Sequence, residues 1–259
     1  MGDTLLTRTV DAVRIISYNR PERHNALDDA TAEAFHRAFA EAVEDAGVRA
    51  ILIRGEGKSF CSGRDVAVLG HRARDESDFL FVRRHQDARL AMQDCPKPIV
   101  AALKGAALGG GLEGALVADI RVADTTLKIA MPEINYGLLP DTGGTQLLAA
   151  LIGPSRAKYM VLSGERIDAQ TAFEWGAVDF LVAPEELDGR ALAIARTLAA
   201  KPPIALAMGK AMVDQMFGPA IRNGTRQELL AQTALFLTED YKEARAAHRE
   251  KRTPVYKGR

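Results

Sequence analysis

Two carboxylates lie close together in a loop whose composition suits acid–base chemistry. The segment Met131 to Gln146 is rich in glycine, proline and apolar residues and contains Glu133 and Asp141. A carboxyl group in apolar surroundings tends toward a raised pKa, which a general acid or base working near neutral pH requires. Taken singly, either residue is also compatible with a solvated loop, and Asp141 with a cap for a helix that begins near Thr142.

A third acidic residue, Glu113, follows a run of three glycines. The segment Ala106 to Glu113 contains Gly109, Gly110 and Gly111 ahead of an apolar stretch. Glycines at this point suit a helix N-terminus, where unpaired peptide N–H groups and the helix dipole favour an anion. The segment matches neither the GxGxxG pattern nor the P-loop pattern of nucleotide sites. It indicates an anion site or, alternatively, tight helix packing with Glu113 as a compensating surface charge.

A third segment, Lys58 to Asp65, follows a predicted strand. Small residues flank Gly63, and such a turn can expose peptide N–H groups to a ligand. The same pattern is compatible with an ordinary strand-to-helix turn.

The elements that must position these segments alternate between strand and helix. Short runs rich in β-branched residues predict strands, and three- and four-residue apolar spacing from Phe35 to Ala46 predicts a helix capped by Asp28 or Asp29. The expected strands are Val13–Ser17, Ala50–Ile53, Ile99–Leu103, Ile120–Ala123, Leu127–Ala130 and Val178–Val182. From Pro184 the pattern is helical, with an interruption expected at Asn223-Gly224. We therefore expect an α/β core over residues 1–195 and a helical subdomain over residues 196–259.

Composition narrows the class of protein. The 259 residues are 47% hydrophobic, and 34 Lys and Arg balance 34 Asp and Glu. This composition excludes disordered and fibrous proteins, and the balanced charge argues against a nucleic-acid or anionic-membrane partner. Cys61 and Cys95 are too few for a disulfide framework and lack metal-ligand spacing. The first residues lack the apolar run of a signal peptide, and the longest apolar stretch is interrupted by charges, so we expect a cytoplasmic protein without a metal.

The order of these segments resembles the enoyl-CoA hydratase/isomerase (crotonase) superfamily. The resemblance rests on Phe60-Cys-Ser-Gly-Arg-Asp65, then Ala107-Leu-Gly-Gly-Gly-Leu-Glu113, then Pro132-Glu-Ile134 and Pro140-Asp-Thr-Gly-Gly-Thr-Gln146. It extends to Asn19-Arg-Pro-Glu-Arg-His-Asn-Ala-Leu27 and covers essentially the whole chain. No motif is decisive alone, but their joint order and spacing are specific.

The resemblance implies a fold, an assembly and a set of catalytic roles. The family folds as a spiral of repeated ββα units with C-terminal helices that assemble homotrimers, often dimers of trimers. Its members bind acyl-CoA thioesters and stabilise an enolate with two backbone N–H groups, which the resemblance places at Ser62 and Gly110. It implies that Glu113 orients and activates water and that Glu133 donates a proton to the α-carbon. No cofactor is implied, since coenzyme A is part of the substrate.

The resemblance also implies the residues that line the coenzyme A portion, largely through the main chain. These are Glu22, Arg23, His24, Ala26, Phe60, Ser62, Gly63, Arg64, Asp65, Gly109, Gly110 and Pro132. The stretch Val66 to Leu90 is expected to cover the acyl pocket, and its polar residues allow polar or ring-bearing acyl groups.

Three functions are compatible with these residues. Retention of both glutamates favours hydration of a 2-enoyl-CoA. Many hydratases of this family have glycine at the position of Asp141. A carboxylate there, eight residues after Glu133, instead resembles the arrangement in double-bond isomerases of the family, and it implies isomerisation by Glu133 and Asp141. A catalytically idle, RNA-binding or scaffold relative is disfavoured by the glutamate pair and by the absence of a basic excess.

Overall fold

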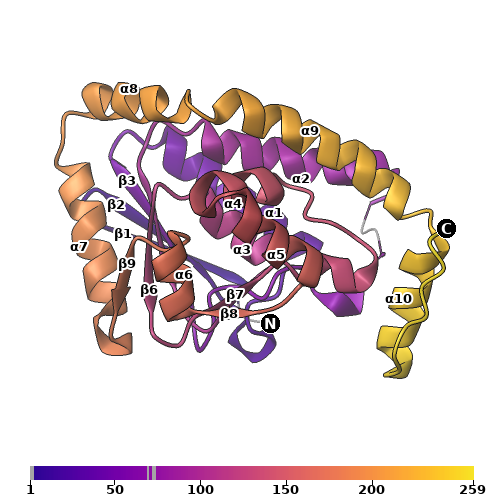
Figure 1. Ribbon diagram of the computed structural model, residues 1–259. Helices are drawn as coiled ribbons and strands as arrows, with labels where there is room; N and C mark the ends of the chain where they lie inside the picture. Colours follow the sequence, from indigo (N-terminus) through magenta and orange to yellow (C-terminus); the bar gives the residue numbers. More distant parts are fainter. Residues whose placement is uncertain (1–2, 69, 72–73) are drawn as a thin grey trace.

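The computed structural model describes residues 3–68, 70–71 and 74–259, and two sheets form its centre (Figure 1). The larger sheet has the strand order β1-β2-β3-β4-β6-β9, and every pairing except β1 with β2 is parallel. Its strands are β1 (Leu5–Val10), β2 (Val13–Tyr18), β3 (Ala50–Gly55), β4 (Ile99–Leu103), β6 (Ile120–Asp124) and β9 (Phe180–Val182). The smaller sheet joins β5 (Ala106–Leu108), β7 (Lys128–Ala130) and β8 (Ile167–Asp168).

The chain visits the two sheets in turn, which is the ββα spiral that the resemblance implies. β4 in the large sheet is followed by β5 in the small sheet and then by α3 (Gly110–Leu116), and β6 is followed by β7. The inner strands β2, β3, β4 and β6 of the large sheet are mostly apolar on both faces because helices cover both of them, whereas the edge strand β1 is largely exposed. The predicted strands are all present, but β1, β5 and β8 were not predicted from the sequence.

Helices cover the sheets and carry the site. They are α1 (Asp29–Glu44), α2 (Asp78–Gln93), α4 (Gly144–Ile152), α5 (Pro154–Ser163), α6 (Ala169–Trp175) and α7 (Leu187–Ala199), together with short 3-10 turns at Pro21–Arg23, Val66–Val68, Pro132–Tyr136 and Pro184–Glu186. Asp28 caps α1, since its side chain accepts a hydrogen bond from the Thr31 N–H. The helix predicted between the first two expected strands is thus confirmed with one of its two candidate caps.

The last three helices run along the outside of this core (Figure 1). They are α8 (Pro203–Asp214), α9 (Gly218–Leu235) and α10 (Glu239–Glu250). The predicted boundary at residue 195 falls within α7, which packs Leu187, Ala191 and Ala195 on the large sheet. α9 packs against α2 and α4, so the C-terminal region lies directly over the segments that carry Glu113 and Asp141.

The interruption predicted at Asn223-Gly224 is wrong, because both residues lie inside α9. A Cβ at Gly224 would lie 2.4 Å from the Gln146 side chain, so the glycine permits close approach of α9 to α4. The helical tail breaks instead between α9 and α10, at Phe236 to Thr238.

In the part of the chain that the structure describes, no single helix is long and apolar enough to cross a membrane. Pro184–Ala199 and Pro203–Asp214 pass that test only as a pair, by length and composition, and are bent by 109° relative to each other.

Candidate active site

Two glycine-rich segments that are distant in sequence lie side by side. The Cys61 N–H donates to the Ala106 carbonyl, and the Leu108 N–H donates to the Cys61 carbonyl, each at 3.0 Å. Gly63 has a φ of +86°, and a Cβ there would lie 2.5 Å from the Leu108 carbonyl oxygen. This position therefore requires glycine on both conformational and steric grounds. The two segments expected to expose N–H groups do meet at one place.

Two N–H groups at this junction have no acceptor among the described residues: those of Arg64 and Gly110. Arg64 forms a parallel bridge with Leu27, in which the Gly63 carbonyl and the Asp65 N–H are the bonded groups. The Arg64 N–H therefore points away from Leu27. Gly110 is the first residue of α3, where the N–H has no partner within the helix.

The prediction that Ser62 supplies one of these donors is wrong. Its N–H donates to the His24 carbonyl at 3.0 Å, which leaves it unavailable to a ligand. A Cβ built at Gly63 would lie 3.4 Å from the Gly110 nitrogen, so the backbone beside Arg64 borders the second donor closely. The pair of free donors is thus Arg64 and Gly110.

Glu113 is held in a fixed orientation by the start of α4. Its carboxylate is buried, and Oε1 accepts hydrogen bonds from the Thr142 N–H at 2.8 Å and the Gly144 N–H at 3.0 Å. A Cβ at Gly144 would lie 2.7 Å from the same Oε1, so only glycine leaves room for this contact. The carboxylate occupies the positive end of the α4 dipole, an environment that suits a negative charge.

Glu133 lies in the opposite kind of environment. It is the second residue of the 3-10 turn Pro132–Tyr136, and its Oε2 is buried with no hydrogen-bond partner among the described residues. Burial, reinforced by the negative charge of Glu113 and more weakly by that of Asp141, raises the pKa of Glu133 well above its ordinary value. Its Oε1 borders the glycine turn before α3, since a Cβ at Gly109 would approach it to 2.6 Å.

Asp141 does not cap α4. The N–H groups of residues 142–145 are taken by Glu113 and by Glu228 of α9, and Glu228 accepts from Gly143 at 2.7 Å and Thr145 at 3.2 Å. Asp141 instead accepts from the Gln232 side chain at 3.2 Å and faces the same cavity as the two glutamates. The alternative of a helix cap is therefore excluded.

One cavity of about 280 Å³ collects these groups. Glu113, Glu133 and Asp141 line it together with both donor-bearing residues, Arg64 and Gly110. Val66, Gly70, Phe81 and His85 of the stretch expected to cover the acyl pocket also line it, while Leu69, Arg72 and Ala73 of that stretch lie outside the described residues.

The residues implied for coenzyme A divide into two groups. Ser62, Gly63, Arg64, Gly109, Gly110 and Pro132 line the cavity. Glu22, Arg23 and His24 are exposed on the turn that precedes α1, and Ala26 is buried at its end.

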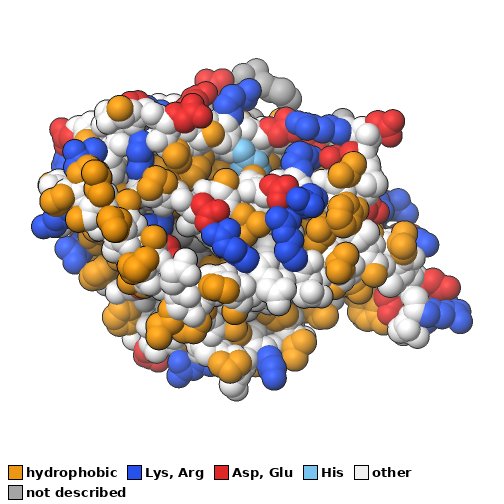
Figure 2. Space-filling model, turned by 90° about the horizontal axis from the view of Figure 1, so that it is seen from above, with side chains coloured by type: hydrophobic (Ala, Val, Ile, Leu, Met, Phe, Trp, Pro, Cys, Tyr) orange, Lys and Arg blue, Asp and Glu red, His pale blue; other side chains and the backbone are white. Residues whose placement is uncertain are grey.

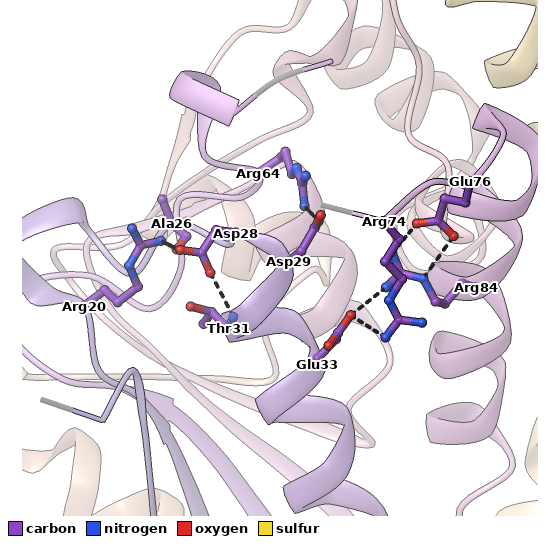
Figure 3. Close-up of polar contacts among 10 residues, drawn as sticks. All are labelled: Arg20, Ala26, Asp28, Asp29, Thr31, Glu33, Arg64, Arg74, Glu76 and Arg84. Carbon is purple, nitrogen blue, oxygen red and sulfur yellow. Dashed lines mark hydrogen bonds and ion pairs between the residues drawn. The ribbon is translucent and has the colours of Figure 1, made fainter. Parts of the chain in front are cut away.

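Several of these side chains already have protein partners. Phe60 is buried edge-to-face against Tyr18, and Asp65 pairs with Arg20 at 3.3 Å. Arg64 pairs with Asp29 at the start of α1 (Figure 3). A role for these positions in binding coenzyme A is therefore confined to the main chain for Phe60 and Asp65, and it stays a prediction.

Sequence reasoning missed residues that β2, α1 and α9 bring to the site. Tyr18 of β2, His36 of α1 and Gln232 of α9 line the cavity, and Glu228 binds the start of α4. Arg89 of α2 also lines the cavity and lies within the stretch Val66 to Leu90 that was expected to cover the acyl pocket. A signal existed in α9, because Thr225, Glu228 and Gln232 recur at three- and four-residue spacing and form a buried polar stripe. Among residues 3–68, 70–71 and 74–259, no group of three or more His, Cys, Asp or Glu side chains is placed to hold a metal ion.

Comparisons with known proteins agree with this geometry. Residues 8–259 match the family described as Enoyl-CoA hydratase/isomerase. The chain is 35% identical over 260 residues to the 2,3-dehydroadipyl-CoA hydratase of Escherichia coli, with all of both chains covered. It is 32% identical to the crotonyl-CoA hydratase of Syntrophomonas wolfei, with 96% of each covered.

A solved structure extends the likeness to three dimensions. The crystal structure of an enoyl-CoA hydratase from Mycobacterium avium subsp. paratuberculosis superposes with a TM-score of 0.88 at 26% identity, covering 98% of this chain and 99% of that one. With the family matched across nearly its whole length, the chain belongs to the enoyl-CoA hydratase/isomerase family.

Proposed function

We propose that this enzyme hydrates a 2-enoyl-CoA thioester by syn addition of water. The observation that carries the proposal is the pairing of Glu113 and Glu133 in one cavity, beside two unpaired backbone N–H groups. The thioester oxygen would lie between the N–H groups of Arg64 and Gly110. Donors fixed before the reaction stabilise a developing enolate oxygen by about 3–4 kcal/mol each.

The two carboxyl groups then divide the proton transfers. Glu113, held by the α4 amides, accepts a proton from water as the water oxygen bonds to the β-carbon. The π electrons of the Cα–Cβ bond move toward the thioester, forming the enolate. Glu133, protonated because of its raised pKa, gives its proton to the α-carbon as the enolate collapses. One proton then returns from Glu113 to Glu133 through solvent, which restores the starting state.

Incubation with a panel of 2-enoyl-CoA esters in heavy-oxygen water tests this reaction. We expect a 3-hydroxyacyl-CoA product that carries the label. A product with a shifted double bond and no label would contradict hydration and show that the enzyme is an isomerase.

A second candidate activity is migration of a double bond along an enoyl- or dienoyl-CoA. Its support is Asp141, a third carboxylate that faces the same cavity as Glu133. In this reaction one carboxylate removes a proton from the acyl chain, and a carboxylic acid returns one at another carbon.

Asp141→Asn separates the two activities, because asparagine keeps the acceptor that Gln232 contacts. If Asp141 transfers protons, isomerase turnover of this variant falls by about 10²-fold or more, while hydration changes only a few-fold. Equal turnover of wild type and variant on 2-enoyl-, 3-enoyl- and dienoyl-CoA esters would restrict Asp141 to a structural role.

We also propose that the chain forms a homotrimer or a dimer of trimers through its last helices. None of the residues of α8 is buried, although the helix exposes large apolar side chains, and more follow in and after α9 (Figure 2). They include Ile204, Met208, Met212, Val213, Met216, Leu230 and Leu237, each more than half exposed. A surface of this kind is typical of an interface between subunits. Light scattering should give a trimer or hexamer mass, and a monomer at micromolar concentration would contradict the proposal.

A further inference from the structure

A buried arginine lines the same cavity as the three carboxylates. Arg89 of α2 is only 8% exposed, yet none of the described carboxylates pairs with it. Its closest polar contacts are the Met92 sulfur at 3.5 Å and the Gly110 carbonyl at 3.4 Å, and its Nε is buried without a partner. A buried guanidinium that lacks an anion is costly, and proteins seldom retain one without a use for it.

The neighbouring arginines do not share this property. Arg64 pairs with Asp29 at 2.5 Å, and Arg84 pairs with Glu76 at 2.7 Å (Figure 3). The acidic residues near α1 and α2 are thus already engaged by these arginines. Arg89 forms no ion pair with these or with the other described carboxylates, and its Nε has no hydrogen-bond partner among the described residues.

The surroundings of Arg89 are shaped to hold it. Gly114 of α3 faces the guanidinium, and a Cβ there would lie 2.8 Å from Nη1. His85 lies one turn earlier on the same face of α2, lines the cavity and has a buried Nε2 without a partner. Burial, with the charge of Arg89 as the next cause, lowers the pKa of His36 to about 4, so this nearby ring is neutral and adds no competing charge.

The position of Arg89 relative to the reaction centre sets the length of chain that it can reach. Gly110 supplies a proposed enolate donor through its N–H. The Arg89 guanidinium contacts the Gly110 carbonyl on the other side of that residue and extends to Gly114, one turn further along α3 and about 6 Å along the helix axis. A ligand group beside Arg89 therefore lies a short acyl chain away from the thioester.

We propose that Arg89 binds a carboxylate at the far end of the acyl chain, so that the substrate is a short enoyl-CoA of dicarboxylic-acid type. This inference rests on the proposed hydration only for the enoyl part of the substrate. A carboxylate satisfies the guanidinium through two parallel hydrogen bonds, and the neutral histidine His85 can donate a third. A methyl-terminated chain would leave the charge buried and unpaired.

Binding of unreactive ligands tests the proposal independently of catalysis. The probes are saturated acyl-CoA esters of five to eight carbons in matched pairs, one ending in methyl and one in carboxylate, measured by calorimetry. For the best chain length, we expect the wild type to bind the carboxylate form at least about 30-fold more tightly, since a lost buried charge pair weakens binding by that order or more. Arg89→Met should abolish this preference, and Arg89→Lys should retain part of it.

Arg83→Met is the matched control, because Arg83 lies on the same helix but is exposed and pairs with Asp87. It should keep the wild-type preference. If Arg89→Met fails to fold, Gly114→Ala tests the same point, since the added methyl group displaces the guanidinium without removing its charge. Equal binding of both probes by the wild type, or an unchanged preference in Arg89→Met or Gly114→Ala, would overturn the proposal.

Turnover of matched 2-enoyl-CoA esters separates this inference from the proposed reaction. Hydration of both esters without a carboxylate preference refutes the role of Arg89 and leaves the hydratase intact. A carboxylate preference in binding without hydration of any ester refutes the hydratase and leaves the role of Arg89 intact.

Discussion

Glu113 and Glu133 are the same residue type in the same cavity, yet they experience opposite environments. Glu113 accepts two backbone hydrogen bonds at the positive end of α4, whereas Glu133 has a buried oxygen with no partner among the described residues and a raised pKa. Solvation by fixed amides favours the ionised form, and burial without such amides favours the neutral form. A pair of identical side chains is thereby separated into a base and an acid.

Replacing the acid should have the largest effect. Glu133→Gln removes the proton that we assign to the α-carbon, and we expect hydration turnover to fall by about 10³-fold, within the range for a lost general acid. Binding of a saturated acyl-CoA should change little, because the proposed thioester contacts lie at Arg64 and Gly110. Near-normal turnover would remove Glu133 from the mechanism.

Replacing the base should have a smaller effect that differs between reactions. In Glu113→Gln the amide oxygen can still accept from Thr142 and Gly144, so the fold is kept while the proton acceptor is lost. We expect hydration to fall by about 10²-fold and isomerisation to fall less.

The same variant also tests the electrostatic link between the two glutamates. The charge of Glu113 helps to raise the pKa of Glu133. Hydration requires protonated Glu133 and is lost as pH rises through that pKa. In Glu113→Gln the basic limb of the kcat/KM profile of the remaining activity should therefore move to lower pH, and an unmoved limb would show that the two carboxyl groups are not coupled.

A change that leaves both carboxylates in place tests whether the orientation of Glu113 matters. Gly144→Ala places a methyl carbon 2.7 Å from Glu113 Oε1 and 2.8 Å from its Cγ. We expect turnover to fall by about 10-fold and stability by about 1–3 kcal/mol, as for other overpacked positions. Gly189→Ala, with nothing within 4 Å, is the control and should not destabilise α7. Wild-type turnover in Gly144→Ala would mean that the position of Glu113 tolerates displacement.

The smallest effect concerns Glu228 of α9, a buried carboxyl group that shares the N–H groups at the start of α4 with Glu113. Burial, followed by the charge of Glu113, raises the pKa of Glu228 from 4.5 to about 8. The folded protein therefore holds a proton that the unfolded chain releases near pH 4.5. This contribution to stability is complete below that pH and is lost as pH rises to about 8.

Glu228→Gln has no such proton to lose. Between pH 5 and pH 8 the free energy of unfolding of the wild type should fall more than that of the variant, by a few kcal/mol at most. Urea unfolding at the two pH values measures the difference. Parallel pH dependence of the two proteins would mean that Glu228 does not titrate in this range.

The sequence was sufficient for features that depend on local pattern and motif order. β-branched runs located most strands of the large sheet, and the motifs correctly predicted that Glu113, Glu133 and Asp141 face one cavity. The sequence was insufficient where a single backbone hydrogen bond decides which N–H group is free to bind a ligand. Arg64 rather than Ser62 has the free N–H because His24 takes the Ser62 hydrogen and the Leu27 bridge turns the Arg64 N–H outward, and these partners lie about forty residues earlier in the chain.

The stretch Val66 to Leu90, expected to cover the acyl pocket, does supply Val66, Phe81, His85 and Arg89 to the cavity lining, but the sequence did not indicate what surrounds them. Gln86 and Arg89 lie on the buried face of α2. A buried helix face is normally recognised in a sequence by apolar residues at three- and four-residue spacing, so these two polar residues weaken that signal. Their surroundings come from α1, α3 and α9, and no local pattern in α2 indicates which helices will cover it.

The hydrogen bonds from Gly143 and Thr145 to Glu228 have a consequence for folding during synthesis of the chain on the ribosome. Glu228 lies 85 residues after Gly143, so a ribosome adding about 5–20 residues per second makes the α4 loop roughly 4–17 s before it makes the carboxylate that binds it. During that interval the nascent chain contains both Glu113 and Glu133, but Gly143 and Thr145 lack their acceptor. A transcript truncated before α9 would therefore encode every residue assigned to proton transfer but not the carboxylate that accepts from the Gly143 and Thr145 N–H groups.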